Sequence, residues 1–223
     1  MNSPIFLDIG NTNAKWRFEG DYFEVPIAEF SFEKLPKTSK IWVSNVSPNL
    51  AIKNQSNISF VESEEKYKSL INSYKNPKNL GVDRWLLMIA TYELSLGKEF
   101  IVVDIGSAVT IDLVDNSGLH LGGVIFPGLF KIRNTFNYFP VEKEIKLKDI
   151  GESTKQAWSI GTLDLIVNGI NQKIHELKQR MPYANIYLTG GGYEDIQKFI
   201  DFSHDYHKNL VLDGLELYAD NVG

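Results

Sequence analysis

The stretch FLDIGNTNAKWRF, residues 6–18, decides the fold that this sequence predicts, because a near copy returns as VVDIGSAVTIDLV, residues 102–114. In both copies an apolar run leads into Asp-Ile-Gly, at Asp8 and Asp104, and a second apolar run follows. This pattern is typical of a strand, a tight glycine turn and a second strand that folds back on the first. Because the pattern occurs twice, we expect two related halves with a cleft between them.

The turn that follows Asp8 is a candidate phosphate-binding loop. Gly10 lacks a Cβ, so a ligand can approach the backbone amides that follow it. Side chains that add donors or positive charge come next: Asn11, Thr12, Asn13 and Lys15. A phosphate at ~4 Å from Asp8 would be repelled by roughly 4 kcal/mol at an effective dielectric of ~20, so we expect a cation between them. A single Asp-x-Gly can be an ordinary hairpin turn, whereas two copies favour a nucleotide site.

The composition is that of an ordinary globular protein. The chain has 223 residues, of which 43% are hydrophobic and 23% charged, so it can bury a core in one large or two small domains. The net charge of −5 gives no general attraction for nucleic acid, which requires clustered Lys and Arg. The absence of cysteine excludes disulfides, thiolate zinc sites and cysteine nucleophiles.

The N-terminal segment predicts neither secretion nor insertion into a membrane. Met1 leads almost directly into an apolar strand at residues 5–9, with no basic segment before a long apolar one. No apolar run in the chain approaches the ~18 residues of a membrane span. We therefore expect a cytoplasmic protein with no membrane partner.

Apolar periodicity predicts alternating strands and helices. Strands are expected at residues 5–9, 14–18, 22–27, 40–46, 58–61, 100–104, 110–115, 119–125 and 185–189. Helices are expected from residue 85 to about 96, at 129–136, at 153–179 with an interruption near Gly161, and at 193–199, with a final helical turn after 210–212. A helix start is expected at 47–49, a loop or edge strand at 141–148, and a surface helix or ordered loop outside the core at 62–79.

The order of these elements predicts an α/β fold. Three antiparallel strands open each half, and helices alternate with the strands that follow. This order matches a duplicated ribonuclease-H-like unit with mixed sheets flanked by helices, as in the actin-like ATPases and sugar kinases. We place the domain boundary after the helix that begins at Trp85, which gives domains 1–98 and 99–223.

Asp83 and Arg84 are the candidate catalytic and substrate-binding pair. They follow Gly81 at the entrance of a predicted helix. Asp83 can accept a proton from a substrate hydroxyl, and Arg84 can bind a substrate carboxylate through two parallel hydrogen bonds. The structural alternative is that Asp83 only caps the helix and Arg84 is solvated. Spacing alone does not decide between these interpretations.

Other motifs are weaker evidence for a particular function. Thr189-Gly-Gly-Gly after a short apolar strand is a candidate platform for a nucleoside, while His204 and His207 have no carboxylate pattern that completes a metal site. No Walker A loop, G-x-G-x-x-G fingerprint or G-x-S-x-G elbow is present. The usual support for P-loop, Rossmann and serine-hydrolase functions is therefore missing.

Taken together, five motifs in this order resemble the type III pantothenate kinases: Asp8-Ile-Gly-Asn-Thr12, Leu80-Gly-Val-Asp-Arg-Trp85, Asp104-Ile-Gly-Ser-Ala-Val-Thr110, Gly122-Gly-Val-Ile-Phe-Pro-Gly128 and Thr189-Gly-Gly191. They span nearly the whole chain, and their order is more specific than any one of them. The resemblance implies an actin-like fold, a homodimer, and ATP-dependent phosphorylation of pantothenate to 4'-phosphopantothenate, the first step of coenzyme A biosynthesis.

The resemblance also implies roles for individual residues. Asp83 resembles the general base, and Asp104 resembles the ligand of the monovalent cation, potassium or ammonium, that the family requires. Magnesium is expected to enter with ATP, bridged to Asp8 mostly through water. The implied ATP contacts are Asp8, Ile9, Gly10, Asn11, Thr12, Asn13, Ala14, Lys15 and Ser107, the last at a position where the family usually has Thr. The implied pantothenate contacts are Tyr74, Gly81, Val82, Asp83, Arg84, and Thr154 from across the dimer.

Two alternatives share the same fold. One is a transcriptional regulator that kept the shape of the family and lost the activity, against which the intact Asp8, Asp83, Arg84 and Asp104 count. The other is a kinase of another small molecule, such as a sugar. Arg84 instead predicts preference for an alcohol that carries a carboxylate.

Overall fold

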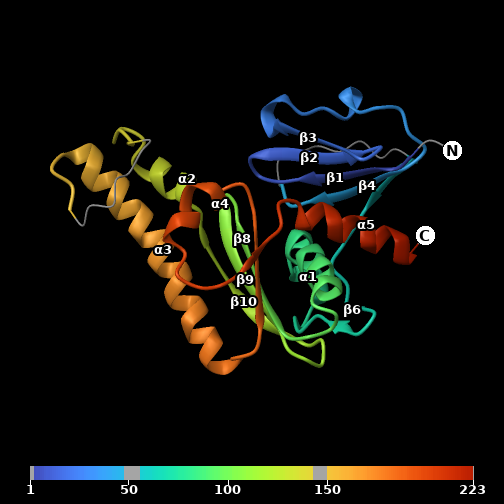
Figure 1. Cartoon of the computed structure of the whole chain (residues 1–223). Helices are drawn as coiled ribbons and strands as arrows, with labels where there is room; N and C mark the ends of the chain where they lie inside the picture. The colour runs from blue at the N-terminus through green and yellow to red at the C-terminus, as the bar shows by residue number, and fades with distance from the viewer. Residues whose placement is uncertain (1–2, 48–55, 143–149, 223) are drawn as a thin grey trace. The chain divides into compact units, whose positions relative to one another are not determined.

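The computed structural model describes residues 3–47, 56–142 and 150–222 (Figure 1). Within these ranges the strands form two five-stranded sheets and one two-stranded ribbon. Both large sheets have the same order, in which the third, second, first, fourth and fifth strands lie side by side. The structure therefore repeats the unit that the two Asp-Ile-Gly copies predict. None of the described helices is both long and apolar enough to cross a bilayer.

The first sheet has the order β3-β2-β1-β4-β5, and Figure 1 labels the first four of these strands. Its strands are β1 Ile5–Ile9, β2 Asn13–Phe18, β3 Asp21–Pro26, β4 Ile41–Asn45 and β5 Ile58–Phe60. The first three strands form an antiparallel meander, β4 runs parallel to β1, and β5 runs parallel to β4. Two short 3-10 helices, Ile27–Glu29 and Phe32–Lys34, connect β3 to β4.

Alternation along β1 gives the two faces of this sheet different surroundings. One face carries an apolar cluster that contains Ile5, Leu7, Ile9, Trp16 and Val43. The opposite face carries Asp8 and Trp42, and there α1 (Val82–Leu94) and α5 (Leu210–Val222) pack against each other and against β4. The ring of Trp42 contacts that of Tyr218 on α5, with centroids 6.3 Å apart. Asp8 therefore lies on the helix-covered face.

The second sheet has the order β10-β9-β8-β11-β12. Its strands are β8 Phe100–Ile105, β9 Ala108–Val114, β10 His120–Pro127, β11 Asn185–Thr189 and β12 Asp205–Tyr206. Only Gly106 and Ser107 separate β8 from β9, as the predicted tight turn requires. The helices of this part are α2 Leu129–Arg133, α3 Thr154–Arg180 and α4 Tyr193–Ile196, with 3-10 turns at Asn134–Phe136 and Gln197–Phe199.

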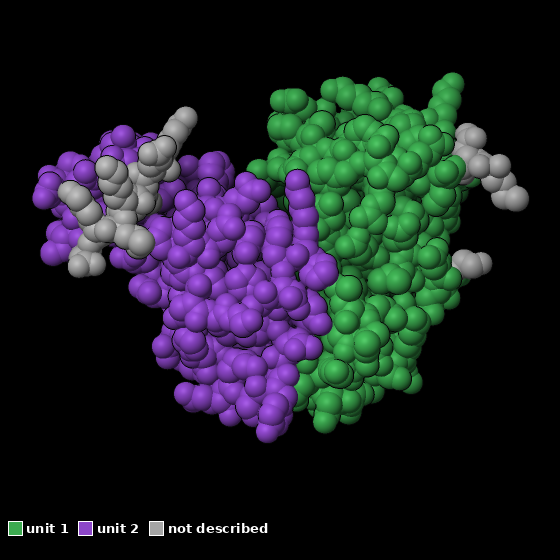
Figure 2. All heavy atoms as spheres, in the orientation of Figure 1, with its two compact units in different colours: residues 1–100, 112–122, 209–223 green, residues 101–111, 123–208 purple. Residues whose placement is uncertain are grey.

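The chain divides into two compact units that are interleaved in sequence (Figure 2). The first contains residues 1–100, 112–122 and 209–223, and the second contains residues 101–111 and 123–208. All strands of the first sheet precede residue 98, and all strands of the second follow residue 99. The domain boundary between these residues and the cleft between the halves stay predictions.

Four local predictions differ from the structure. Helix α1 begins at Val82 rather than at Trp85, and α3 runs through Gly161 without interruption. The end of the chain is the 13-residue helix α5 rather than a single turn. Segment 62–79 is an ordered loop with β6 Lys66–Tyr67, β7 Leu70–Ile71 and a 3-10 helix at Pro77–Asn79, and it buries Leu70 completely. The elements expected at 47–49 and 141–148 fall largely on residues 48–49 and 143–148, outside the described ranges.

Candidate active site

Four polar residues form one row across the first sheet. Glu24, Lys15, Asp8 and Ser44 lie directly opposite one another on β3, β2, β1 and β4. Residues that are directly opposite in a sheet project from the same face. The Ser44 hydroxyl donates a hydrogen bond of 2.9 Å to Asp8 Oδ1, and Lys15 Nζ lies 3.9 Å from Glu24 Oε1. The Asp8 carboxylate is thus flanked by a hydroxyl donor and a lysine.

Asp8 lies close to Asp83, which comes from α1 of the same unit. Burial raises the pKa of Asp8 to about 6, and the negative charge of Asp83 adds to the shift. The hydrogen bond from Ser44 and the charge of Lys15 act in the opposite direction. Burial likewise raises the pKa of Asp83. The charges of these two carboxylates therefore act on one another within the first unit.

The loop after Asp8 is closed by backbone hydrogen bonds. Gly10 N donates to Asn13 O at 3.0 Å, and Ile27 N donates to Thr12 O at 2.8 Å. Ile9 and Ala14 flank this loop and are fully buried, so only their backbone can face a ligand. Asn11 and Thr12 are exposed at the tip, whereas Asn13 Nδ2 donates to Glu24 Oε1 at 2.6 Å. A phosphate at this loop would therefore compete with Glu24 for Asn13 and Lys15.

The entrance of α1 fixes the Asp83 carboxylate. Gly81 is the N-cap residue, and a Cβ there would lie 2.6 Å from Asp83 Oδ1, so glycine leaves room for this carboxylate. Asp83 Oδ1 accepts a hydrogen bond of 2.8 Å from Arg84 N in the first helical turn. Gly81, not Asp83, is the N-cap residue, so the structural alternative is wrong in making Asp83 the cap; Asp83 bonds within the first helical turn, and its charge also acts on Asp8.

Arg84 is paired rather than solvated. Its exposed fraction is 4%, and it donates from Nε to Asp112 Oδ2 at 2.8 Å and from Nη2 to Asp112 Oδ1 at 2.5 Å. Its Nη1 donates to the hydroxyl of Tyr74 at 3.0 Å. Three of the five guanidinium N–H groups are thus bonded, and one hydrogen on each terminal nitrogen remains for a ligand. The structure joins Tyr74 and Arg84, both predicted from the sequence.

Asp112 and His120 belong to this cluster, although neither is among the residues predicted from the sequence. They are 1% and 0% exposed, and His120 Nε2 lies 2.9 Å from Asp112 Oδ1. The only local signal for either is an ionisable side chain inside an apolar strand. Nothing in the pattern says which partner such a side chain meets, because Arg84 comes from another element.

In the second unit, Asp104 packs against a glycine turn. Gly190 has a φ of +101°, and a Cβ at this position would clash with Asp104 Oδ1 and with the carbonyl of Ile105. Gly192 N donates to Ile105 O at 2.8 Å. The Thr189-Gly-Gly motif and the second Asp-Ile-Gly copy are therefore in direct contact, which their distance in the sequence does not predict.

Ser107 and Thr154 also lie in the second unit. The carbonyl of Ser107 accepts a hydrogen bond of 2.9 Å from Gly128 N, which ties the β8–β9 turn to the Pro127-Gly128 motif. Thr154 is the exposed first residue of α3, after the N-cap Ser153. Their roles, and the meeting of Asp104 with Asp8 and Asp83, stay predictions.

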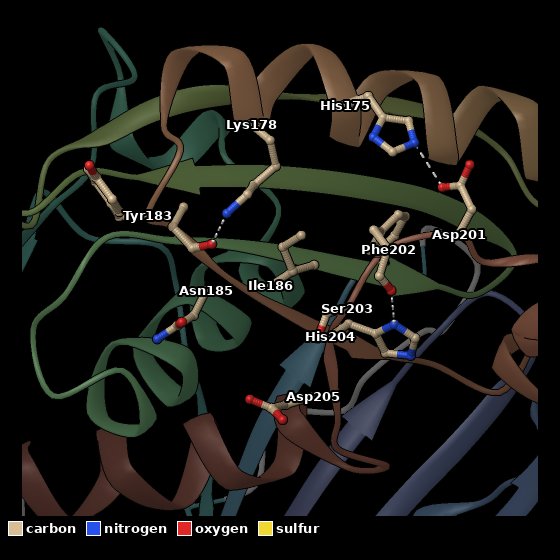
Figure 3. Close-up of a pocket in the computed structure, with 11 residues that line it drawn as sticks. His175, Lys178, Tyr183, Asn185, Ile186, Asp201, Phe202, Ser203, His204 and Asp205 are labelled. Carbon is tan, nitrogen blue, oxygen red and sulfur yellow. Dashed lines mark hydrogen bonds and ion pairs between the residues drawn. The ribbon is translucent and has the colours of Figure 1, made fainter.

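A pocket of about 480 Å³ in the second unit is separate from these residues (Figure 3). It lies between the C-terminal half of α3 and the segment 183–186, with residues 201–205 along its edge. His175 bonds to Asp201 at 2.9 Å, and Lys178 Nζ donates to the carbonyl of Ala184 at 3.0 Å. None of the residues predicted as a site lines it.

The described residues contain no group of three or more His, Asp or Glu side chains that could hold a metal ion. A cation at Asp8 or Asp104 would need other oxygen ligands, and Mg²⁺ in kinase sites typically takes these from phosphates and water. Asp8 suits this arrangement, because a cation would offset both its burial and the nearby charge of Asp83.

Comparison with known proteins identifies a matching family model and related sequences. A family model described as type III pantothenate kinase matches residues 19–176. A type III pantothenate kinase from Alcanivorax borkumensis is 30% identical, over 96% of this chain and 98% of that protein. Another, from Hahella chejuensis, is 31% identical over 97% of each chain.

Solved structures share the fold. A structure from Campylobacter jejuni, described as a Baf family transcriptional activator, aligns with a TM-score of 0.65 and 27% identity over 97% of both chains. The activator of 2-hydroxyisocaproyl-CoA dehydratase from Clostridium difficile, with bound ADPNP, aligns with a TM-score of 0.53 and 12% identity, over 97% of this chain and 94% of that one. At that identity the second likeness concerns the fold alone.

Proposed function

The chain belongs to the type III pantothenate kinase family, and from this membership we propose how its residues carry out the reaction. It is a kinase that phosphorylates pantothenate in coenzyme A biosynthesis. Phosphoryl transfer from ATP needs an aligned hydroxyl, a base and groups that neutralise charge on the transferred phosphoryl. The proposal assigns these tasks to the residues described above.

Asp83 is the general base that accepts the proton of the pantothenate hydroxyl. Burial raises its pKa, which makes its carboxylate a stronger base than an exposed aspartate. The hydrogen bond from Arg84 N holds one carboxylate oxygen in place. The proximity of Asp83 to Asp8, on the loop proposed for ATP, is the observation that carries this assignment.

Arg84 and Tyr74 bind the carboxylate of pantothenate, together with Gly81 and Val82. Asp112 occupies the Nε and Nη2 side of the guanidinium, so the substrate would be bound by the remaining hydrogens of Nη1 and Nη2. The hydroxyl of Tyr74 already accepts from Nη1 and can donate its own hydrogen to the substrate. This arrangement favours an alcohol with a carboxylate over a sugar.

ATP binds along residues 8–15 and at Ser107, with Asp8 and Asp104 facing its cations. Magnesium and a monovalent ion, potassium or ammonium, supply positive charge to the phosphates when they are bound. Asp8 would hold the hydrated magnesium, and Asp104, against the turn at Gly190, would hold the monovalent ion. Lys15 and the backbone after Gly10 would contact phosphate oxygens.

We further propose that the enzyme is a homodimer in the cytoplasm, where ATP is available. Large apolar side chains are exposed on β10, α2 and α3 and before α3, and exposed apolar side chains of this size are typical of surfaces that other chains cover. They are Leu121, Val124, Ile125, Phe130, Ile150 and Leu165. Thr154 would reach pantothenate of the partner subunit. Sedimentation equilibrium should give twice the chain mass.

The decisive test is pantothenate-dependent release of ADP, measured with potassium or ammonium against sodium. We expect turnover with either of the first two ions and much less with sodium. Sugars should not replace pantothenate in a substrate panel. A protein that binds ATP and releases no ADP with pantothenate under any of these ions would instead fit the regulator alternative.

A further inference from the structure

Asp112 and His120 close a ring of contacts around the proposed carboxylate site. Arg84 bonds to Asp112 and to Tyr74, and Asp112 bonds to His120. The His120 ring stacks on that of Tyr74, with centroids 5.9 Å apart and planes 15° from parallel. Ser73 Oγ lies 3.4 Å from His120 Nδ1. All of these residues belong to the first unit.

The chemistry of this ring fixes its hydrogen positions. The carboxylate of Asp112 only accepts, so His120 Nε2 carries the hydrogen of their contact, and Ser73 Oγ lies at the other ring nitrogen, Nδ1. Asp112 then accepts three hydrogen bonds, two from Arg84 and one from His120. A guanidinium bonded through two parallel contacts cannot rotate in its plane, so its free edge points in one direction.

We propose that Asp112, held by His120, is a positioning residue that aims the free edge of Arg84, and with it Tyr74, at the carboxylate of the acceptor substrate. The proposal rests on the binding role assigned above to Arg84 and Tyr74. A buried ion pair is weak evidence for stability, because apolar side chains of the same volume stabilise a core as well. A role in orienting the guanidinium of Arg84 explains why a charged pair, rather than apolar side chains, occupies this position.

Asp112 also keeps Arg84 away from the proposed base. Arg84 follows Asp83 directly, and its positive charge lowers the pKa of Asp83, whereas the charge of Asp112 raises it. Without Asp112 the guanidinium would be free to turn toward Asp83 and pair with it. The same residue therefore preserves a binding group and leaves the base available to the hydroxyl.

The test compares pantothenate with pantothenol, in which a hydroxymethyl group replaces the carboxylate. For Asp112→Asn we expect the KM for pantothenate to rise about 10- to 100-fold, because this is the usual effect of losing a hydrogen bond to a charged group. The KM for ATP should stay unchanged. The KM for pantothenol should change little, so discrimination between the two alcohols falls. His120→Asn, which keeps the ion pair, should give a smaller effect in the same direction if Asp112→Asn folds poorly.

Two further variants make the result specific. Asp115→Asn removes a carboxylate three residues away that bonds only within its own turn, to Ser117 and Leu119, and should leave the discrimination unchanged. Arg84→Gln should raise the KM for pantothenate, and adding Asp112→Asn to it should add little, because one residue acts through the other. Additive effects in the double variant would overturn the positioning role and leave the substrate-binding proposal standing. Normal discrimination in both single variants, Asp112→Asn and His120→Asn, would have the same consequence. An unchanged KM in Arg84→Gln would overturn the substrate-binding proposal and this one with it.

Discussion

The carboxylate of Asp83 lies close enough to Asp8 for its negative charge to add to the effect of burial, and together they raise the pKa of Asp8 to about 6. The two residues come from the end of β1 and the start of α1, so their approach depends on how α1 packs on the first sheet. Two neighbouring carboxylates without a bound cation are unfavourable in a stable fold. These two charges therefore lower the stability of the apo enzyme, and bound cations would offset that loss.

The first prediction concerns stability against pH. The folded pKa of Asp8 lies above its ordinary value of 3.8, so the stability it contributes is present below about pH 4 and lost as the pH rises through about 6. Asp8→Asn removes the charge and should make the apo protein more stable than wild type at pH 8, by on the order of 1–3 kcal/mol. The gain should shrink at pH 5 and vanish near pH 4, as urea unfolding would measure.

Ser44→Ala is the matched control for that prediction. It removes the hydroxyl that stabilises the charged form of Asp8, so it should destabilise the protein more at pH 8 than at pH 5, the opposite trend. If Asp8→Asn were no more stable than wild type at pH 8, the inference that burial and the charge of Asp83 destabilise the charged form of Asp8 would be wrong.

The second prediction concerns the base. Asp83→Asn keeps the shape of the side chain and its contact with Arg84 N, but it cannot accept a proton. We expect kcat to fall by roughly 10²–10⁴-fold, with the KM for ATP and the circular dichroism spectrum unchanged. Steady-state ADP release at saturating pantothenate would measure this. A variant with nearly normal kcat would remove Asp83 from the mechanism.

The sequence predicts the elements whose signals are local. Each Asp-Ile-Gly copy carries its own strand, turn and strand, and their repetition predicts two sheets of the same order. The sequence predicts only a final helical turn where α5 runs for 13 residues, and Gly214 within it lowers the helix propensity. In the fold this glycine lets α5 approach Leu86 of α1, and that packing stabilises a helix that propensity alone does not favour.

Long-range pairs could not be predicted in the same way. Arg84 and Asp112 lie 28 residues apart on a helix and a strand, and no periodicity links them. Segment 62–79 lacks a repeating pattern, yet it buries Leu70 and Asn72, because a two-residue strand pair and side-chain hydrogen bonds together hold its backbone. Asn72 Nδ2, for example, donates to the carbonyls of Glu64 and Pro77. The partners in such loops follow from the fold, not from local sequence.

The third prediction separates two adjacent glycines in the second unit. A Cβ on Gly190 would clash with Asp104 and Ile105 in a backbone with positive φ, whereas one on Gly191 meets nothing within 4 Å. Gly190→Ala should destabilise the protein by roughly 1–3 kcal/mol and weaken the response of turnover to potassium. Gly191→Ala should do neither. Thermal unfolding and a potassium titration would measure both, and equal behaviour of the two variants would contradict the contact at Asp104.

The fourth prediction concerns the packing of α1 against α5. A Cβ on Gly214 of α5 would clash with the backbone carbonyl of Leu86, so Gly214→Ala must push the two helices apart. We expect a loss of roughly 1–3 kcal/mol in the free energy of unfolding, and a fall in kcat, because α1 carries Asp83 at its start. Chemical denaturation and ADP release would measure the two effects.

The matched control lies in α3. Gly161 is exposed within this helix, and a Cβ there meets nothing within 4 Å, so Gly161→Ala should stabilise the protein by about 0.5–1 kcal/mol through helix propensity alone. Its kcat should stay normal, since nothing proposed for the active site rests on this residue. A Gly214→Ala variant as stable and as active as Gly161→Ala would show that α1 and α5 do not meet as closely as the fold places them, and that the position of Asp83 does not depend on α5.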